Sequence, residues 1–211
     1  MSPVVAIDGP AAAGKGTLAR RVAAELGFDY LDTGLIYRAV GMNVERAGFD
    51  PADPARAGEA ARDLQPQDLQ AGDLRGDEAA QAASKVAAIP EVRAALLDFQ
   101  RRFAAHPPGG TGAVLDGRDI GTVVCPDAPI KLYVTASAET RAGRRLLELR
   151  GKGVDTSFDT VLTEMRERDD RDSSRAVAPL KPAADAFLLD TSDMDAAAAF
   201  DAAIAFIRAK L

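Results

Sequence analysis

Short apolar runs alternate with longer helical patterns along most of the chain. The runs expected to form β-strands are Val4–Ile7, Phe28–Leu31, Ala113–Leu115, Ile130–Thr135 and Phe187–Leu189. Between them, apolar residues recur at three- and four-residue spacing, which is typical of amphipathic helices. Helices are expected over 18–26, 33–46, 91–106, 137–172 with an interruption at Gly151 and Gly153, and 200–211. This alternation predicts an α/β fold, in which a five-stranded parallel sheet is flanked by helices on both faces.

The segment 50–82 departs from this alternation, because it is polar, alanine-rich and broken by prolines and glycines. It predicts short helices or loops, and residues 60–80 contain no alternating β pattern. At 211 residues, the chain has the length for one well-buried core with small inserted subdomains. A single domain over residues 1–211 is therefore expected.

A glycine-rich turn follows the first predicted strand, within the sequence PVVAIDGPAAAGKGT at residues 3–17. Gly9 and Gly14 allow the backbone to turn its N–H groups inward, where the start of the next helix can hold a nucleotide phosphate. Lys15 can then reach the β and γ phosphates. The usual pattern has a hydroxyl directly after the lysine, whereas this chain has Gly16 there and Thr17 one place later. We interpret the turn as a phosphate-binding loop; a glycine-rich turn that binds nothing is the alternative.

Composition excludes several classes of protein. The formal net charge of −6 argues against a protein that coats nucleic acid or an anionic membrane. Cys125 is the single cysteine, so no intrachain disulfide can form, as is typical of a reducing compartment. No apolar run reaches the roughly 18 residues of a membrane span, and no signal-peptide pattern opens the chain. A cytoplasmic location is expected.

Arginines are concentrated in the sequence ERDDRDSSR at residues 167–175. Helical spacing would place Arg168, Arg171 and Arg175 on one face of a helix. Their like charges repel one another there unless a bound anion compensates them. Asp172 falls among them and can hold Arg168 and Arg175 in place. Three oriented arginines over a phosphate loop would clamp a transferring phosphoryl group. The alternative is a solvated helix with ion pairs between successive turns.

Two further segments supply cations. In LDGRDIG at residues 115–121, Arg118 can contact a phosphate and Asp119 can accept hydrogen bonds, although an ordinary salt bridge in a turn is the alternative. Tyr37 and Arg38 lie on the helix that follows the Asp32-Thr33 cap. These segments carry more cations than one nucleoside triphosphate requires, so a second phosphorylated molecule is indicated.

The chain contains no Ser-His-Asp, Cys-His or metal-ligand cluster in its sequence. Transfer of a phosphoryl group to a phosphate acceptor needs none of these, because the acceptor oxygen is already anionic at neutral pH. An alcohol acceptor would more often need a carboxylate base. The inventory of many arginines and no base therefore favours a nucleoside monophosphate as acceptor.

In five segments the chain resembles the bacterial cytidylate kinases: IDGPAAAGKGT, LDTGLIYRAV, QAASKVAAIPEVRAAL, LDGRDIGTVVCPDAPIKLYV and ERDDRDSSRAVAPLKPAADAFLLDTS. The resemblance covers nearly the whole chain. It implies a P-loop kinase fold with a monophosphate-binding subdomain at 38–92 and a mobile helical lid at 151–175. It also implies phosphoryl transfer from ATP to CMP or dCMP, giving ADP and CDP or dCDP, with Mg²⁺ as the metal that accompanies ATP.

The resemblance also implies roles for individual residues. The ATP-binding loop would comprise Gly9, Pro10, Ala11, Ala12, Ala13, Gly14, Lys15, Gly16 and Thr17. The CMP site would comprise Thr33, Tyr37, Arg38, Ser84, Arg93, Arg118, Asp119, Arg168, Asp172 and Arg175. Within it Arg38, Arg118 and Arg175 would lie near the acceptor phosphate, Ser84, Arg93 and Asp119 near cytosine, and Arg168 and Asp172 near the sugar. Catalysis is assigned to Lys15, Arg118, Arg168, Arg171 and Arg175, and no residue is assigned as a metal ligand.

This chain departs from the family pattern in two places. The family commonly has glycine where this loop has Ala12, which raises the question of whether the turn there needs a positive φ. Many members also carry a longer insert with a small antiparallel sheet, and the shortened 60–80 region is not expected to form it in full. Discrimination between acceptors could be looser as a result.

Three other functions remain open from the sequence: a kinase specific for adenylate, a kinase of a small metabolite, and a P-loop regulatory module that hydrolyses ATP slowly. Ser84, Arg93 and Asp119 are the set that favours cytosine over adenine. A carboxylate can accept a hydrogen bond from the N4 amine of cytosine, which uracil lacks. The expected partners are ATP and CMP or dCMP, with no nucleic acid and no membrane, and the protein is expected to be a monomer.

Overall fold

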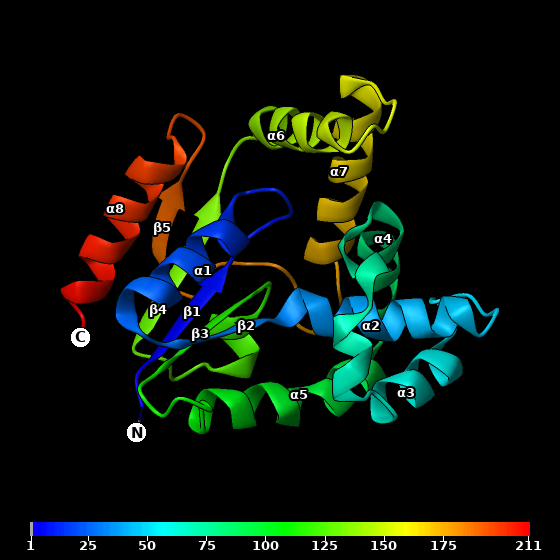
Figure 1. Ribbon diagram of the computed structural model, residues 1–211, viewed down its shortest axis with the longest axis horizontal. Coiled ribbons are helices and arrows are strands. Elements are labelled where there is room, and N and C mark those ends of the chain that lie inside the picture. The colour runs from blue at the N-terminus through cyan, green and yellow to red at the C-terminus, as the bar shows by residue number, and fades with distance from the viewer. Residues whose placement is uncertain (1) are drawn as a thin grey trace.

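The computed structural model describes residues 2–211, except for the side chains of Pro66 and Arg75. In this part of the chain five strands form one sheet, and every pair of neighbouring strands is parallel (Figure 1). The sheet order is β2-β3-β1-β4-β5, for strands β1 (Val4–Asp8), β2 (Asp29–Asp32), β3 (Ala113–Gly117), β4 (Ile130–Thr135) and β5 (Phe187–Asp190). The predicted five-stranded parallel sheet is confirmed, and each strand lies within two residues of its predicted range.

Side chains on the central strand β1 alternate between two cores, as the period of a strand requires. Val5 and Ile7 pack with α1 (Lys15–Leu26) and α8 (Ala196–Arg208) on one face of the sheet. Ala6 packs on the opposite face, with Ala104 of α5 (Pro90–Ala105) and with the short π-helical turn Ile120–Val124. Helices therefore cover both faces, as predicted, and residues Val4–Ile7 of β1 are all apolar because neither face of the strand meets water.

A helical subdomain extends beyond the edge of the sheet at β2 (Figure 1). It consists of α2 (Thr33–Arg46), α3 (Pro54–Arg62), α4 (Asp77–Val86) and the first half of α5, with two short 3₁₀ turns at Pro66–Gln70 and Gly72–Arg75. Gly41 allows α2 and α4 to approach closely, since a Cβ there would lie 2.7 Å from the Cβ of Ala82. The sequence left open whether residues 60–80 keep part of a small sheet; they contain the end of α3, the two 3₁₀ turns and the start of α4, and no strand.

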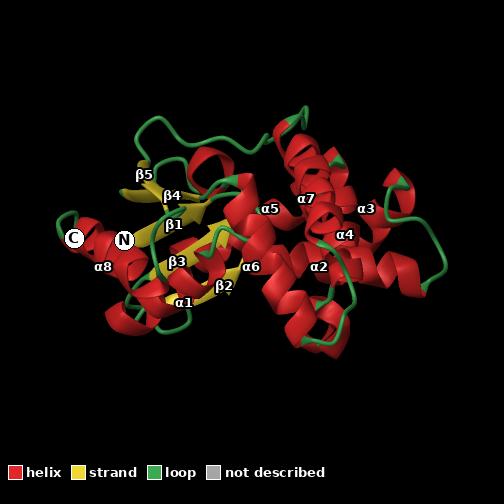
Figure 2. Ribbon diagram, turned by 90° about the horizontal axis from the view of Figure 1, so that it is seen from above, coloured by secondary structure: helices red, strands yellow, loops and turns green. Residues whose placement is uncertain are grey.

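Two further helices, α6 (Ala138–Gly151) and α7 (Phe158–Ser173), form a pair with its own apolar cluster. Figures 1 and 2 show this pair beyond the ends of the strands, with α7 beside the helical subdomain. The interruption predicted at Gly151 and Gly153 is the turn between them, where Gly153 adopts a φ of 77°. No helix in the described residues is long and apolar enough to cross a membrane.

Candidate functional site

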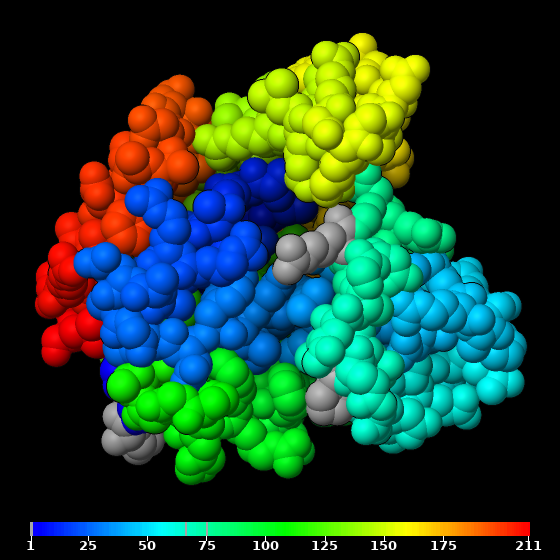
Figure 3. Space-filling model, in the orientation of Figure 1, coloured from blue at the N-terminus to red at the C-terminus, as the bar shows by residue number. Residues whose placement is uncertain are grey.

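The strands of a parallel sheet end at one edge, and here that edge opens into a cavity of about 1030 Å³. The cavity is lined by the glycine-rich loop, the starts of α2 and α1, α4, the end of β3, and the α6–α7 pair. Figure 3 shows the molecule hollowed between the blue N-terminal core, the yellow α6–α7 pair and the teal α4. Sixteen of the twenty candidate residues from the sequence line this cavity, and the four that do not are Gly9, Pro10, Ala13 and Arg171.

The glycine-rich loop has the backbone geometry of an anion-binding turn. Gly9 approaches β4 so closely that a Cβ would lie 2.0 Å from the carbonyl oxygen of Val134. Gly14 has a φ of 88° and precedes the first turn of α1, whose free N–H groups face the loop. Ala12 has a φ of 57°, which answers the question raised by the sequence. The turn does need a positive φ there, and this chain places an alanine in it.

The side chain of Lys15 lines the cavity, and its Nζ donates to the carbonyl oxygen of Pro10 at 3.4 Å. Burial, and next the guanidinium of Arg118, lower the pKa of Lys15 to about 7. Arg168 lowers the pKa further, whereas Asp116 and Asp32 oppose the shift. The lysine therefore lies in an excess of positive charge that the phosphates of a nucleotide would compensate.

Asp116, at the end of β3, lies beside this loop and is almost fully buried. Burial raises its pKa to about 6, although Lys15 opposes the shift. The Tyr30 hydroxyl donates to its Oδ1 at 3.3 Å, and a Cβ on Gly16 would lie 3.2 Å from its Oδ2. A side chain directly after the lysine would crowd this carboxylate, which explains why Gly16 replaces the usual hydroxyl.

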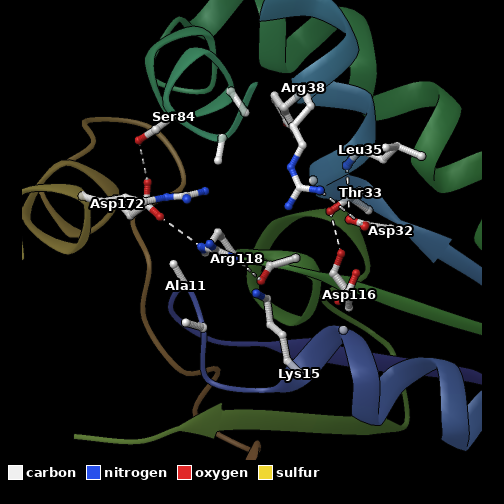
Figure 4. Close-up of a pocket in the computed structure, with 18 of the residues that line it drawn as sticks. Ala11, Lys15, Asp32, Thr33, Leu35, Arg38, Ser84, Asp116, Arg118 and Asp172 are labelled. Carbon is white, nitrogen blue, oxygen red and sulfur yellow. Dashed lines mark hydrogen bonds and ion pairs between the residues drawn. The ribbon is translucent and has the colours of Figure 1, made fainter. Parts of the chain in front are cut away.

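The start of α2 supplies the opposite wall, as Figure 4 shows for Asp32, Thr33 and Arg38. Asp32 caps α2 by accepting a hydrogen bond from the backbone N–H of Leu35 at 3.1 Å. The Thr33 hydroxyl donates to the backbone carbonyl of Asp116 at 2.7 Å, which joins α2 to the end of β3. Arg38 projects into the cavity, and its closest carboxylate is Asp32 at 4.0 Å.

Asp172 is the centre of the arginine cluster. Its carboxylate accepts a hydrogen bond from Nε of Arg118 at 2.9 Å, another from Arg175, and a third from the Ser84 hydroxyl at 3.3 Å (Figure 4). Burial alone would raise the pKa of Asp172, but Arg118, Arg175 and Arg168 lower it below its usual value. Asp172 thus holds two arginines, as predicted, but the second is Arg118 rather than Arg168.

The predicted alignment of three arginines on one helical face is not observed. Helix α7 ends at Ser173, so Arg175 lies in the following segment and turns back onto Asp172. Arg171 is exposed, donates to Oε1 of Gln81 at 2.7 Å and does not line the cavity. The structure brings Arg118, Arg168 and Arg175 together and leaves Arg171 on the surface.

Arg168 differs from its neighbours because no carboxylate in the described residues forms an ion pair with it. Its Nε, like that of Arg175, is buried without a hydrogen-bond partner. Burial, and next Arg118, lower the pKa of Arg168 to about 10. A buried N–H donor without an acceptor is costly unless a ligand supplies one. An anion bound in the cavity would do so.

A buried ion pair between Arg93 and Asp119 forms the end of the cavity beside α4 and α5. Arg93 also donates to the carbonyl oxygen of Ala87 at 3.2 Å, and its guanidinium lies 5.6 Å from the centre of the Tyr37 ring. The ion-pair partner of Asp119 is thus Arg93 rather than its sequence neighbour Arg118, and Ser84 of α4 also lines the cavity. Two backbone N–H groups, of Ile120 and Gly121, donate to Asp8 at 2.7 and 2.8 Å and fix the turn that follows Asp119.

Sequence reasoning missed the cations of α6. Arg145 lines the cavity and pairs with Asp77 of α4 and with Glu148, and Arg144 donates to the carbonyl oxygen of Thr191 at 2.6 Å. The adjacent arginines in RAGRR, on a helix that starts at the end of a predicted strand, were the available signal. Their position over the cavity depends on the fold of the α6–α7 pair, which the sequence pattern does not give.

Comparisons with known proteins agree with this geometry. The family model described as cytidylate kinase matches residues 5–209. A cytidylate kinase of Paramagnetospirillum magneticum is 73% identical over 210 residues and covers all of both chains. Another, of Rhodospirillum rubrum, is 63% identical over 95% of each chain.

Solved structures of lower identity share the fold alone. An uncharacterized protein from Eubacterium ventriosum has a TM-score of 0.56 at 16% identity, over 98% of this chain and 99% of its own. An unliganded sugar kinase from Janibacter has a TM-score of 0.50, also at 16% identity, over 99% of this chain and 95% of its own.

A parallel sheet whose first strand leads into a glycine-rich phosphate loop, beneath a cleft lined with arginines, defines a P-loop kinase. The matches extend over the whole domain, including the helical subdomain and the α6–α7 pair. The chain belongs to the cytidylate kinase family, whose members transfer a phosphoryl group from ATP to CMP or dCMP.

Proposed function

We propose that this protein binds ATP in the loop Gly9–Thr17 and CMP or dCMP between the helical subdomain and α7, and that Lys15, Arg118, Arg168 and Arg175 act on the phosphates. The observation that carries this proposal is the half-buried side chain of Arg168, whose Nε is buried without a hydrogen-bond partner and which shares one cavity with the phosphate loop. The ligand that best completes such a cavity is a pair of phosphorylated molecules whose phosphates meet beneath these arginines.

At the donor end, the N-terminus of α1 and the glycine-rich turn hold the β-phosphate, and Lys15 reaches the β and γ phosphates. Mg²⁺ accompanies ATP. It needs only one or two carboxylates, since phosphates and water complete its shell. Asp116, buried but facing the cavity beside Gly16, fits that need and would contribute to holding the ion, whose charge neutralises the phosphate oxygens.

At the acceptor end, Arg38, Arg118 and Arg175 hold the phosphate of the monophosphate. Its oxygen is anionic at neutral pH, so transfer needs alignment and charge compensation rather than a base. Arg168 and Lys15 compensate the charge of the group in transfer. Arg171 is not included in this group, because its side chain lies outside the cavity and contacts Gln81.

The base is read by Asp119, Arg93 and Ser84. Arg93 fixes the carboxylate of Asp119, which leaves an acceptor oxygen for the N4 amine of cytosine. Uracil presents the O4 carbonyl oxygen at the same position, so the carboxylate would repel it. Asp172, with Arg168, contacts the sugar, while Thr33 and Tyr37 support the wall formed by α2.

We further propose that residues 38–92 act as the monophosphate-binding subdomain and residues 151–175 as a lid, within a monomer. The helical subdomain and the α6–α7 pair each have an apolar cluster of their own, which supports two parts distinct from the core of the sheet, although the clusters extend beyond these bounds at Ile36, Leu96 and Ala142. Each cluster can move as a unit without breaking the core of the sheet.

A coupled assay of ADP release with CMP, dCMP, UMP and AMP tests the proposed function. We expect the highest kcat/KM with CMP or dCMP, a value roughly tenfold to a hundredfold lower with UMP, and little activity with AMP. ADP release that does not depend on the acceptor would contradict the proposal and indicate a slow ATP-hydrolysing regulator.

A further inference from the structure

Arg141 lies in the first turn of α6 and contacts three separate parts of the molecule. Its side chain is buried and does not line the cavity. It donates to the carbonyl oxygen of Ala136 at 2.9 Å, to the carbonyl oxygen of Ala11 at 3.2 Å, and to both carboxylate oxygens of Asp169 at 3.2 and 2.6 Å. One guanidinium thus joins the end of β4, the phosphate loop and helix α7.

A second contact joins the same loop to the same helices. The side chain of Ala12 packs against the apolar cluster of the α6–α7 pair, which is formed by Ala142, Leu149, Val161 and Met165. Ala12 has a φ of 57°, a conformation in which alanine is less favourable than glycine. The backbone conformation at Ala12 therefore disfavours its methyl group, whereas the packing of that group against the α6–α7 pair favours it.

The hydrogen bond to Ala11 also orients the loop. Because the peptide bond is planar and trans, a carbonyl of Ala11 that points toward Arg141 makes the N–H of Ala12 point away from it. Inward-facing N–H groups are what a phosphate loop offers its ligand. Arg141 can hold this peptide only while Asp169 holds Arg141, and Asp169 belongs to α7.

We propose that Arg141 is a positioning residue, which couples the docking of α7 to the shape of the phosphate loop. When α7 is docked, Asp169 and the Ala12 contact fix the loop in its phosphate-binding form. When α7 moves away, the loop loses both restraints, and ATP is bound less tightly. This inference rests on the proposed role of the loop Gly9–Thr17 in binding ATP.

The chain offers a matched control. Glu139 of α6 and Arg166 of α7 form a second ion pair between the same helices, at 2.9 Å, but both side chains are exposed and neither touches the loop. Asp169→Ala and Glu139→Ala each remove one carboxylate from one α6–α7 ion pair. Only the first should affect the loop.

The experiment measures binding of a non-hydrolysable ATP analogue and, separately, of CMP to the full-length wild type and to both variants. We expect Asp169→Ala to weaken analogue binding about tenfold, as for loss of a charge-assisted hydrogen bond, with CMP binding changed less than twofold. Glu139→Ala should change neither by more than about twofold. Equal analogue affinity in both variants would overturn the inference.

Ala12→Gly provides an independent arm that does not remove a buried charge. Glycine adopts a positive φ without strain, so the Tm of Ala12→Gly should equal or exceed that of the wild type. Analogue binding should nevertheless weaken, and protease should cleave residues 151–175 faster than in the wild type. Wild-type analogue affinity in Ala12→Gly would also overturn the inference. A wild type that binds no analogue would instead contradict the proposed function itself, so the two failures are distinguishable.

Discussion

The carboxylate of Asp172 accepts a hydrogen bond from Nε of Arg118 at 2.9 Å, which connects helix α7 to the end of strand β3. The same carboxylate also binds Arg175 and the hydroxyl of Ser84 on α4. One buried anion therefore joins the core, the helical subdomain and the segment after α7. In the absence of ligand it compensates the guanidinium groups that line the cavity.

Asp172→Asn should destabilise the protein by roughly 3 kcal/mol, since removal of one partner leaves buried guanidinium groups without a counter-charge. Inorganic phosphate should raise the Tm of the variant more than that of the wild type, because an added anion replaces the lost one. Thermal unfolding with and without phosphate measures both effects.

The control for this variant is Asp170→Asn, at an exposed position two residues earlier on α7. It should shift the Tm little and respond to phosphate as the wild type does. The pKa of Asp172 is lowered in the folded protein, so its stabilising contribution is present above the ordinary carboxyl pKa and is lost as pH falls through the folded value. Equal phosphate responses in Asp172→Asn and the wild type would contradict the idea that this carboxylate substitutes for a bound anion.

Lys15→Ala should lower kcat by about a hundredfold or more, because a preorganised cation at the transferring phosphoryl group is lost. Lys210→Ala, at an exposed position near the C-terminus, serves as the control and should retain wild-type kcat. Steady-state kinetics with saturating CMP measure the effect. Near wild-type turnover in Lys15→Ala would show that the loop does not take part in catalysis.

ATP binding should take up a proton above neutral pH. The pKa of Lys15 is lowered to about 7 in the free protein, so the amine is mostly neutral at pH 8. Phosphates favour the ammonium form and raise this pKa, so uptake should approach about one proton at pH 8 and fall toward zero at pH 6. Affinity for ATP should correspondingly decrease as pH rises above 7.

Calorimetry of ATP-analogue binding, in buffers that differ in ionisation enthalpy, counts this proton. Lys15→Met is the control, since it retains the other titratable groups of the cavity, Asp116 and Asp32 among them. Uptake at pH 8 that persists in Lys15→Met would assign the proton to another group.

The lid should close when both substrates are present. Arg118, Arg168 and Arg175 repel one another less once phosphates lie between them, so α7 should be held more firmly over the cavity. Cleavage of residues 151–175 by protease should be slower with an ATP analogue plus CMP than with either ligand alone. Identical cleavage rates without ligand, with either ligand alone and with both would argue against a moving lid.

The sheet and most helices could be predicted from the sequence, because buried parallel strands are short apolar runs and the helices between them carry a clear periodicity. The phosphate loop was equally accessible, since Gly9, Gly14 and Lys15 are local in sequence. The positive φ of Ala12 could not be predicted, because an alanine in a sequence does not indicate that conformation.

Pairing within the site could not be predicted with the same success. Arg118 and Asp119 are adjacent in sequence, yet they bind Asp172 and Arg93, which come from α7 and α5. Arg171 has the helical spacing of a site residue, but its contact with Gln81 depends on how α7 packs against α4. Such choices are made by tertiary packing between distant segments, which local spacing does not encode.

Discrimination between cytosine and uracil at Asp119 is the most direct test of the proposed site. Asp119→Ala removes the acceptor for the N4 amine and the repulsion toward O4, and leaves the phosphate loop unchanged. The measurement is kcat/KM for CMP and for UMP in the wild type and in Asp119→Ala, together with the affinity for an ATP analogue. We expect the CMP value to fall roughly tenfold to a hundredfold more than the UMP value, with analogue affinity unchanged. Equal proportional losses with CMP and UMP would contradict base recognition by Asp119 and leave it only the role of holding Arg93.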